Sequence, residues 1–345
     1  MRSSGTSDAY CVPDDFLQLS RDDQADIIQG SAPKLGLAPM VLEKDVWVCW
    51  TLARLFEMPK RLPMAFKGGT SLSKAFNAIQ RFSEDVDITL DYRRFGLVFD
   101  PFAEGVSKTQ LKRFGDDLKA RVGQHVRDVV GPYFQGILAD QFAGKACRIE
   151  IADGDGKLRV HYPSVLGESS DYLGNSVLIE FGGRNVTEPN ESRAIRPYLA
   201  EIVPALSFPV AEVDVLSPNR TFWEKATLIH VECNRGRFKA NRERLSRHWY
   251  DLAMLADHDI GKQALADRSL LADVVKHKKA FFHNSYANYD ACLSRGLRLV
   301  PDESVLAELS TDFEAMCASG MFYGKPPSFN NIIDRLRGLE TTING

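Results

Sequence analysis

The stretch from residue 66 to residue 90 restricts the fold of this chain more than any other, because a double glycine leads through a helix-like run into a strand-like run. Gly68 and Gly69 form a turn whose unpaired backbone N–H groups precede the helix, and such groups favour an anion. The helix is predicted by apolar residues at helical spacing that pack inward: Leu72, Phe76 and Ile79. The turn is therefore a candidate phosphate site.

Two carboxylates lie on the strand that follows. Asp85 and Asp87 project to one face of it, and the apolar residues project to the other: Val86, Ile88 and Leu90. Two like charges this close are unfavourable without a cation between them, and Mg²⁺ is the hard cation that suits carboxylate and phosphate oxygens. The pattern predicts a magnesium site beside a triphosphate. An exposed edge strand with solvated aspartates is the alternative.

Two other phosphate-binding motifs are absent from the sequence. No GxxxxGK[ST] pattern accompanies Lys67 or Lys74, which disfavours a P-loop. No GxGxxG follows a strand, as a dinucleotide site would require. The double glycine and the paired aspartates therefore point to another class of nucleotide site.

These residues resemble the first motif of the DNA polymerase β-like nucleotidyltransferase superfamily, and more narrowly of the AbiEii/AbiGii-type abortive-infection toxins, which include the MenT-like toxins. The motif consists of the phrase FKGGTSL at residues 66–72 and an R-x-S-x-D-x-D pattern: Arg81, Ser83, Asp85 and Asp87. Three further segments resemble the same family: Glu43–Trp47, Arg220–Lys225 and Arg247–Leu252. The resemblance covers most of the chain.

The resemblance implies an α+β fold. We expect a polymerase β-like nucleotidyltransferase core, built from a mixed sheet flanked by helices, with a C-terminal helical domain. Residues 1–60 would form an N-terminal helical segment packed on the core, residues 61–215 the catalytic core, and residues 216–345 a helical domain that contributes site residues.

The resemblance also implies an activity. We expect a Mg²⁺-dependent nucleotidyltransferase that moves a nucleoside monophosphate from an NTP to an RNA acceptor, the 3′ end of a tRNA, with release of pyrophosphate. The protein would be the toxin of a bacterial toxin–antitoxin pair that confers phage defence by abortive infection, with a cognate antitoxin encoded nearby. The alternatives are nucleotidylation of the protein itself or of a partner protein, and a module that binds a nucleotide or antitoxin without turnover.

Site roles follow for the first motif. Asp85 and Asp87 would be catalytic and hold the metal, while the turn would cradle the triphosphate with help from Lys67 and Arg81: Gly68, Gly69, Thr70 and Ser71. For Arg81 a surface charge beside the turn is an equal alternative. A third carboxylate on a neighbouring strand usually completes the metal site in this superfamily, and Glu180 is the first candidate, with Glu150 as its rival. For both glutamates a solvent-facing position on a half-exposed strand is as good an interpretation.

Two catalytic residues are expected downstream. Lys225 lies on or near an apolar helix face, where its ammonium must reach an anion, although a lysine that snorkels at the core edge is the alternative. By resemblance it would hold a triphosphate oxygen. Asp251 would orient Lys225 or the acceptor, again by resemblance, and an ion pair with Arg247 is the alternative.

A basic run lies between these two residues, and it is either a solvated helix face or a phosphate-binding surface: Arg235, Arg237, Lys239, Arg242, Arg244 and Arg247. A smaller patch follows it: Lys276, Lys278 and Lys279. The chain as a whole has a net charge of -3, so contacts with nucleic acid must come from such local patches.

Composition and hydrophobic pattern also predict the cellular location and the remaining secondary structure. Six cysteines without CxxC spacing and an N-terminus without a signal-peptide core indicate a cytoplasmic protein. Strands are expected at residues 147–152 and 157–162, around a glycine-containing turn at 153–156, and at residues 176–181. An amphipathic helix is predicted by apolar residues that include Val126 and Val129, and from Ser217 onward the pattern is largely helical.

Overall fold

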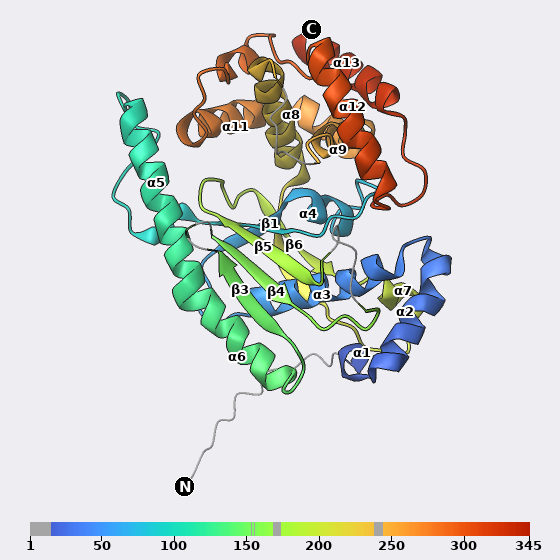
Figure 1. The fold of residues 1–345 in the computed structure, drawn as a ribbon. Helices are drawn as coiled ribbons and strands as arrows, with labels where there is room; N and C mark the ends of the chain where they lie inside the picture. Colours follow the sequence, from blue (N-terminus) through green and yellow to red (C-terminus); the bar gives the residue numbers. More distant parts are fainter. Residues whose placement is uncertain (1–14, 153, 155, 168–173, 238–243) are drawn as a thin grey trace.

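The protein has an α+β fold built on one mixed sheet (Figure 1). The computed structural model describes residues 15–152, 154, 156–167, 174–237 and 244–345. The sheet has seven strands in the order β3-β4-β5-β2-β1-β7-β6. Their bounds are β1 Met64–Lys67, β2 Val86–Leu90, β3 Arg148–Ala152, β4 Lys157–His161, β5 Ser176–Gly182, β6 Asn190–Ile195 and β7 Ala211–Leu216. The predicted fold class is thus confirmed.

Helices flank the sheet and fill the C-terminal part of the chain. Those before β7 are α1 Asp15–Gln18, α2 Arg21–Leu35, α3 Pro39–Phe56, α4 Gly68–Lys74, α5 Lys108–His125, α6 Gly131–Gln141 and α7 Leu199–Ile202, with the 3₁₀ turn η1 Tyr92–Phe95 and the π-helical turn η2 Val126–Val130. Those after it are α8 Pro218–Arg235, α9 Arg247–Asp257, α10 Asp259–Ala266, α11 Arg268–Phe281, α12 Glu303–Ala318 and α13 Phe329–Asn344, with the 3₁₀ turn η3 Tyr289–Leu293. None of the helices in the described part of the chain has the length and apolar character needed to cross a membrane.

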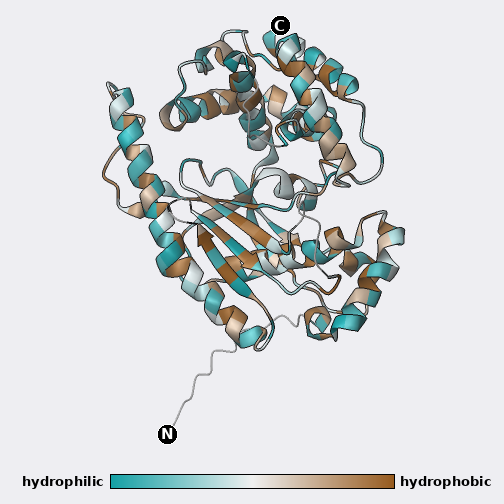
Figure 2. Ribbon diagram, in the orientation of Figure 1, coloured by the Kyte–Doolittle hydropathy of each residue, from teal (hydrophilic) through white to brown (hydrophobic). Residues whose placement is uncertain are grey.

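Strands β3, β4, β5 and β2 have one apolar face and one polar face. Residues such as Leu158, Ile179 and Ile88 are fully buried in a cluster shared with helices α3, α5 and α6. The alternate residues face the other way, and most are exposed or partly exposed, as Arg159 and Glu180 are, although Thr89 and Ser176 are buried. Figure 1 shows β3, β4 and β5 toward the viewer with no described helix drawn across them, and Figure 2 shows the alternation in colour.

A second hydrophobic cluster joins the glycine-turn region to the C-terminal helices. It contains Leu72, Ala78 and Ile79 together with buried residues of α8 to α13. The segment that follows is held to the far end of the chain by backbone hydrogen bonds, from Phe82 N to Met321 O and from Tyr323 N to Gln80 O. The glycine turn therefore packs against the helices that gather at the top of Figure 1. The three-part division of the chain stays a prediction, and its residues 1–14 lie outside the described part.

The local predictions have mixed outcomes. The predicted strands and the helix that begins at Pro218 are confirmed, although Asp153 and Asp155 of the expected turn lie outside the described residues. The helix after the double glycine is shorter than predicted, because it ends at Lys74 and Asn77 adopts a left-handed backbone with φ 48°.

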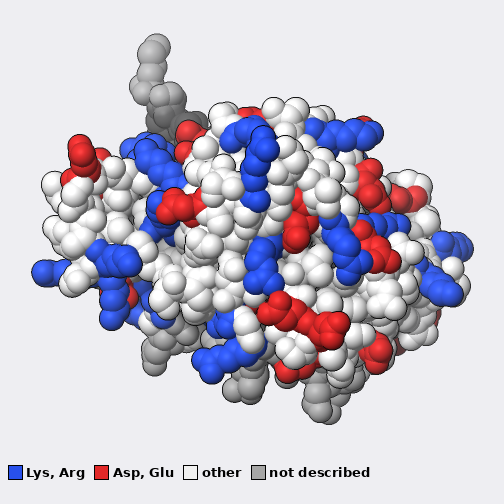
Figure 3. Space-filling view, turned by 90° about the horizontal axis from the view of Figure 1, so that it is seen from above, with Lys and Arg blue, Asp and Glu red and all other residues white. Residues whose placement is uncertain are grey.

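Charged residues of both signs are interspersed over the face formed by the C-terminal helices, as Figure 3 shows.

Candidate active site

The double glycine allows two side chains to approach the turn very closely. Lys67 ends β1 and faces Asp87 across the antiparallel β1–β2 pair. A Cβ atom added at Gly68, which has φ 83°, would lie 2.0 Å from Asp87 Oδ2, and one added at Gly69 would lie 2.6 Å from Arg81 Nη2. Only glycine fits at these two positions, so the sequence motif and the position of Asp87 depend on each other.

Thr70 and Ser71 hold the turn in shape from behind. Thr70 Oγ1 donates hydrogen bonds to the carbonyls of Ser83, at 3.1 Å, and of Asp85, at 2.5 Å. Ser71 Oγ donates to the carbonyl of Gly68 at 2.9 Å. Both side chains are buried, so their hydroxyls are used within the protein. The turn thereby fixes the backbone of Asp85.

Negative charge accumulates around Asp85, which directly precedes β2. Its side chain is 25% exposed. Burial, together with the charge of the adjacent Glu84, raises the pKa of Asp85 to about 6, and Asp87 and Glu180 add to this effect. Arg247 Nη1, 3.8 Å from Asp85 Oδ2, opposes the increase only in part. A cation bound here would relieve this repulsion.

The two candidates for a third carboxylate occupy different places on the polar face of the sheet. Glu180 lies on β5 directly beside Asp87 in the parallel β2–β5 register, and its Oε1 is 2.5 Å from Lys157 Nζ. Glu150 lies on the edge strand β3, with β4 and β5 between it and β2, and contacts His161 at 2.9 Å. Glu180 is therefore the nearer of the two. Among the described residues, however, no three His, Cys, Asp or Glu side chains are grouped closely enough to hold a metal ion.

Arg81, Lys225 and Asp251 form a buried ion cluster between the glycine turn and the C-terminal helices. Asp251 accepts hydrogen bonds from Arg81 Nε at 2.7 Å, from Arg81 Nη2 at 2.8 Å and from Lys225 Nζ at 2.8 Å. Burial alone would raise the pKa of Asp251, but these two cations hold it well below its usual value. Burial lowers the pKa of Lys225, which Asp251 offsets only in part. Arg247, the alternative partner of Asp251, instead lies beside Asp85.

One cavity of about 260 Å³ brings most of the predicted residues together. Its lining includes seven of them: Lys67, Gly68, Gly69, Arg81, Asp85, Asp87 and Lys225. Asp251 has no exposed surface and lies behind Lys225 and Arg81. Thr70, Ser71 and Glu180 do not line the cavity. The cavity thus combines two carboxylates, a glycine turn and several cations.

Some residues of the cavity were not singled out from the sequence. Glu224 is 12% exposed and lies near Lys278, Lys67 and Arg220, and these cations keep its pKa below the usual value although burial raises it. Glu224 adjoins Lys225 in the motif at residues 220–225, and Lys278 belongs to the smaller basic patch. Asn185, whose Oδ1 is buried without a hydrogen-bond partner, gave no signal at all.

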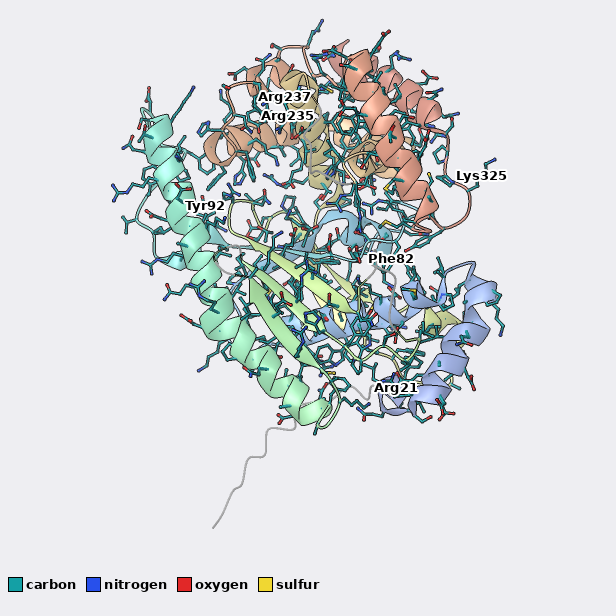
Figure 4. All side chains as sticks on the ribbon, viewed as in Figure 1. Arg21, Phe82, Tyr92, Arg235, Arg237 and Lys325 are labelled. Atoms are coloured by element: carbon teal, nitrogen blue, oxygen red, sulfur yellow. The ribbon has the colours of Figure 1, made fainter. Side chains whose placement is uncertain are left out.

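The basic run between Lys225 and Asp251 divides into two parts. Figure 4 places Arg235 and Arg237 at the end of α8 that points away from the sheet, where Arg235 pairs with Glu232 at 2.8 Å. Arg244 and Arg247 reach Glu84 and Asp85 instead. Two further cations of the run lie outside the described residues: Lys239 and Arg242.

Comparison with known proteins identifies a family and a similar solved structure. The model of a family described as the nucleotidyl transferase AbiEii toxin of a type IV toxin–antitoxin system matches residues 50–335. The structure is also similar to that of MenT4, the nucleotidyltransferase toxin Rv2826c from Mycobacterium tuberculosis H37Rv, at 17% sequence identity and a TM-score of 0.44, over 94% of this chain and 98% of that one. No curated protein matches the sequence significantly.

Proposed function

The chain belongs to the AbiEii family of nucleotidyltransferase toxins of type IV toxin–antitoxin systems, and on that premise we propose that it transfers a nucleoside monophosphate from an NTP to the 3′ end of a tRNA, with Mg²⁺ as cofactor. The supporting observation is the cavity whose lining combines Asp85 and Asp87 with Lys67, Lys225 and Lys278. Carboxylates suit a divalent cation and ammonium groups suit a triphosphate, so this lining matches the two charged parts of a metal–NTP complex.

Asp85 and Asp87 would hold the metal. They fit it because the raised pKa of Asp85 reflects burial and neighbouring carboxylates that Arg247 offsets only in part, and a divalent cation would offset them further. Two carboxylates are enough for Mg²⁺, which usually keeps several waters and binds substrate phosphates as well. Bound Mg²⁺ would neutralise phosphate charge and make the attacking hydroxyl more acidic. Glu180, beside Asp87, is the candidate for a third carboxylate near the metal.

The lysines would bind the triphosphate. Nucleotidyl transfer builds negative charge on the departing pyrophosphate, and fixed cations in a site shielded from water stabilise that charge most effectively. Asp251 holds the Lys225 ammonium in place from behind, and Arg81 in turn fixes both oxygens of Asp251. Asp251 and Arg81 therefore act by positioning Lys225. The absence of a side chain at Gly68 lets Asp87 lie directly against the turn, so the metal-binding carboxylate and the glycine backbone are neighbours in the site.

The acceptor and the setting extend the same proposal. The acceptor is a tRNA 3′ end in the cytoplasm, so that its modification would stop translation, and a cognate antitoxin would relieve this block and make the pair a phage-defence system. A second candidate function keeps the same chemistry and changes the acceptor to a hydroxyl of the protein itself or of a partner.

A labelling experiment tests the proposal. The purified protein is incubated with Mg²⁺, total tRNA and each of the four α-labelled NTPs, and the products are separated before and after ribonuclease treatment. We expect one or more NTPs to label RNA, the Asp85→Asn variant to give no label, and the control Asp259→Asn, which alters an exposed ion pair with Lys262, to behave as wild type. Label that resists ribonuclease and stays with protein would support the second candidate. Equal results for wild type and Asp85→Asn would contradict both.

A further inference from the structure

A second cavity, of about 350 Å³, adjoins the first at Asp85. Asp85 is the residue that lines both cavities. The second one contains neither the glycine turn nor the lysines of the first. Its remaining charged lining consists of Lys44, Glu84, Arg159 and Arg244. The two cavities therefore meet at Asp85, and the second shares none of the triphosphate-binding groups of the first.

The lining of the second cavity is cationic and partly fixed. Glu84 accepts hydrogen bonds from Lys44 Nζ and from Arg244 Nη1, the latter at 2.6 Å, so one carboxylate holds two cations in place. Arg159 projects from β4, where it is exposed to solvent and lies opposite Leu178 of β5. Three cations thus surround a cavity in which Glu84 is the only acid besides Asp85, among the described residues. Such a lining favours an anionic ligand.

The polar face of the sheet extends this cavity toward the edge strand. Arg148 on β3 and His161 on β4 are paired in register, two residues from Arg159 along β4, and project to the same face. This face is the one that Figure 1 shows without a described helix across it. The sheet therefore leaves space for a flexible phosphodiester backbone that lies along the strands and ends at Asp85.

The geometry of the reaction assigns an occupant to the second cavity. In phosphoryl-type transfer the attacking and leaving oxygens are roughly in line, so an acceptor must approach from the side opposite the pyrophosphate. We infer, resting on the function proposed above, that the second cavity binds the single-stranded 3′ end of the acceptor RNA, with Arg159 and Arg244 on its last phosphodiester groups. The terminal ribose hydroxyl then reaches the α-phosphorus beside Asp85.

The transfer balances in this arrangement. The ribose hydroxyl oxygen forms a bond to the α-phosphorus while the bond from that phosphorus to the bridging oxygen breaks. The electron pair of the broken bond leaves with pyrophosphate, and the hydroxyl proton passes to water. The product RNA is one nucleotide longer, and its new phosphodiester lies at the junction of the two cavities.

An RNA strand fits the second cavity better than a protein acceptor. Arg244 and Arg159 line the cavity and can each contact a phosphate, whereas a serine, threonine or tyrosine hydroxyl carries no charge that these arginines would recognise. An acceptor protein would therefore be insensitive to loss of one arginine on β4. Farther along the sheet, Arg148 lies 3.7 Å from Glu150, so the cationic lining is confined to the cavity.

Arg159→Gln tests the assignment, because Arg159 is exposed and can be changed without disturbing the core. Arg193→Gln is the matched control, since Arg193 is an exposed arginine on β6, the edge strand at the opposite end of the sheet. Two quantities are measured: the KM for tRNA, and the Kd of a short 5′-labelled single-stranded RNA at several salt concentrations. For Arg159→Gln we expect the KM for tRNA and the Kd of the RNA to rise about tenfold, because the variant loses one charge-assisted hydrogen bond. The slope of log Kd against log salt should fall by about 0.7, the value for one phosphate on a single strand.

Other readouts separate the outcomes. The KM for the NTP should match that of the control, and Arg159→Lys should recover most of the RNA affinity because it restores the charge. If wild type labels RNA and Arg159→Gln equals Arg193→Gln in RNA affinity and salt slope, the second cavity is not the acceptor site, while the proposed function stands. If wild type labels no RNA, the proposed function itself fails. Label on protein that is unchanged by Arg159→Gln would assign the acceptor to a protein and overturn the inference.

Discussion

At the scale of single residues, Asp85 combines a role in the proposed mechanism with a loss of stability. Its pKa is raised from 3.8 to about 6 in the folded chain, so between these values the folded state holds a proton that the unfolded state has released. Titration of Asp85 therefore lowers the free energy of unfolding as the pH rises from about 4 to about 6. Above about pH 6 this contribution no longer changes with pH. A carboxylate pair kept for function at the expense of stability is a familiar compromise.

Asp85→Asn should accordingly stabilise the protein while removing its activity. The difference in unfolding free energy between variant and wild type should be near zero at pH 4 and approach about 3 kcal/mol at pH 7, from a shift of about two pKa units. Urea unfolding across this pH range, in EDTA so that no divalent cation binds, measures it. A variant that is less stable than wild type at pH 7 would contradict the assignment of repulsion around Asp85.

Replacement of Asp251 should destabilise the protein, in contrast to replacement of Asp85. Asp251→Asn leaves the buried cations Arg81 and Lys225 without their carboxylate, and breaking a buried ion pair from one side costs about 3–5 kcal/mol. The control Asp257→Asn breaks the ion pair with Arg335, in which the aspartate is 58% and the arginine 36% exposed, and should cost less than about 1 kcal/mol. Equilibrium unfolding in urea compares the two. Similar losses would mean that the buried cluster does not anchor the site.

Site residues could be predicted from the sequence where a suitable side chain occurs at a spacing typical of a strand or helix face. Asp85 and Asp87 stand out because a strand pattern places two acids on one face, and Lys225 because it interrupts an apolar helix face. Glu224 and Asn185 could not be predicted in this way, because they reach the cavity through the packing of α8 and of the turn after β5. Their roles depend on tertiary neighbours that no local pattern encodes.

At the scale of elements, the turn between β1 and α4 depends on glycine for two separable reasons. Gly68→Ala should suffer both from its positive φ and from the collision with Asp87, whereas Gly36→Ala, at φ 63° with no atom nearby, should suffer only from its backbone. A left-handed alanine costs about 1–2 kcal/mol. We expect Gly36→Ala to lose about that much stability with full activity, and Gly68→Ala to lose more stability and nearly all activity. Thermal unfolding and the labelling assay distinguish the two, and an active Gly68→Ala would show that Asp87 need not touch the turn.

The sequence predicted some elements correctly and missed others, for different physical reasons. The helix expected to bury Val126 and Val129 buries Val126 and Val130 instead, because the π-helical turn η2 shifts the apolar face, and Val129 is 44% exposed. Strands β6 and β7 were missed, although Val213 and Val215 of β7 alternate with polar residues. Strand β6 is largely exposed and has no such pattern, so its pairing with β7 becomes visible only in the sheet.

At the scale of the whole molecule, the two hydrophobic clusters should unfold together. The second cluster includes Leu72 and Ile79, which follow the glycine turn, so the C-terminal helices cannot separate without exposing apolar residues of the sheet region. The four tryptophans report on the two clusters separately: Trp47 and Trp50 lie in the first, Trp223 and Trp249 in the second.

Two double variants test this cooperativity. With Trp47 and Trp50 replaced by Phe, fluorescence reports on the second cluster, and with Trp223 and Trp249 replaced, it reports on the first. In each variant we expect the urea midpoint from fluorescence to equal the midpoint from far-UV circular dichroism, because one transition involves both clusters. Midpoints that differ between the two probes would show that the clusters unfold independently.

The ion cluster of Arg81, Lys225 and Asp251 also sets the moment during synthesis at which the toxin can become active. A ribosome that has translated the message as far as β7 has released the glycine turn and both aspartates, but not helices α8 and α9. The nascent chain then carries the carboxylate pair and Lys67, but neither Lys225 nor Asp251. On the roles proposed for these residues, we expect the enzyme to be inert until its C-terminal helices have emerged, and a premature stop codon before them to yield an inactive fragment.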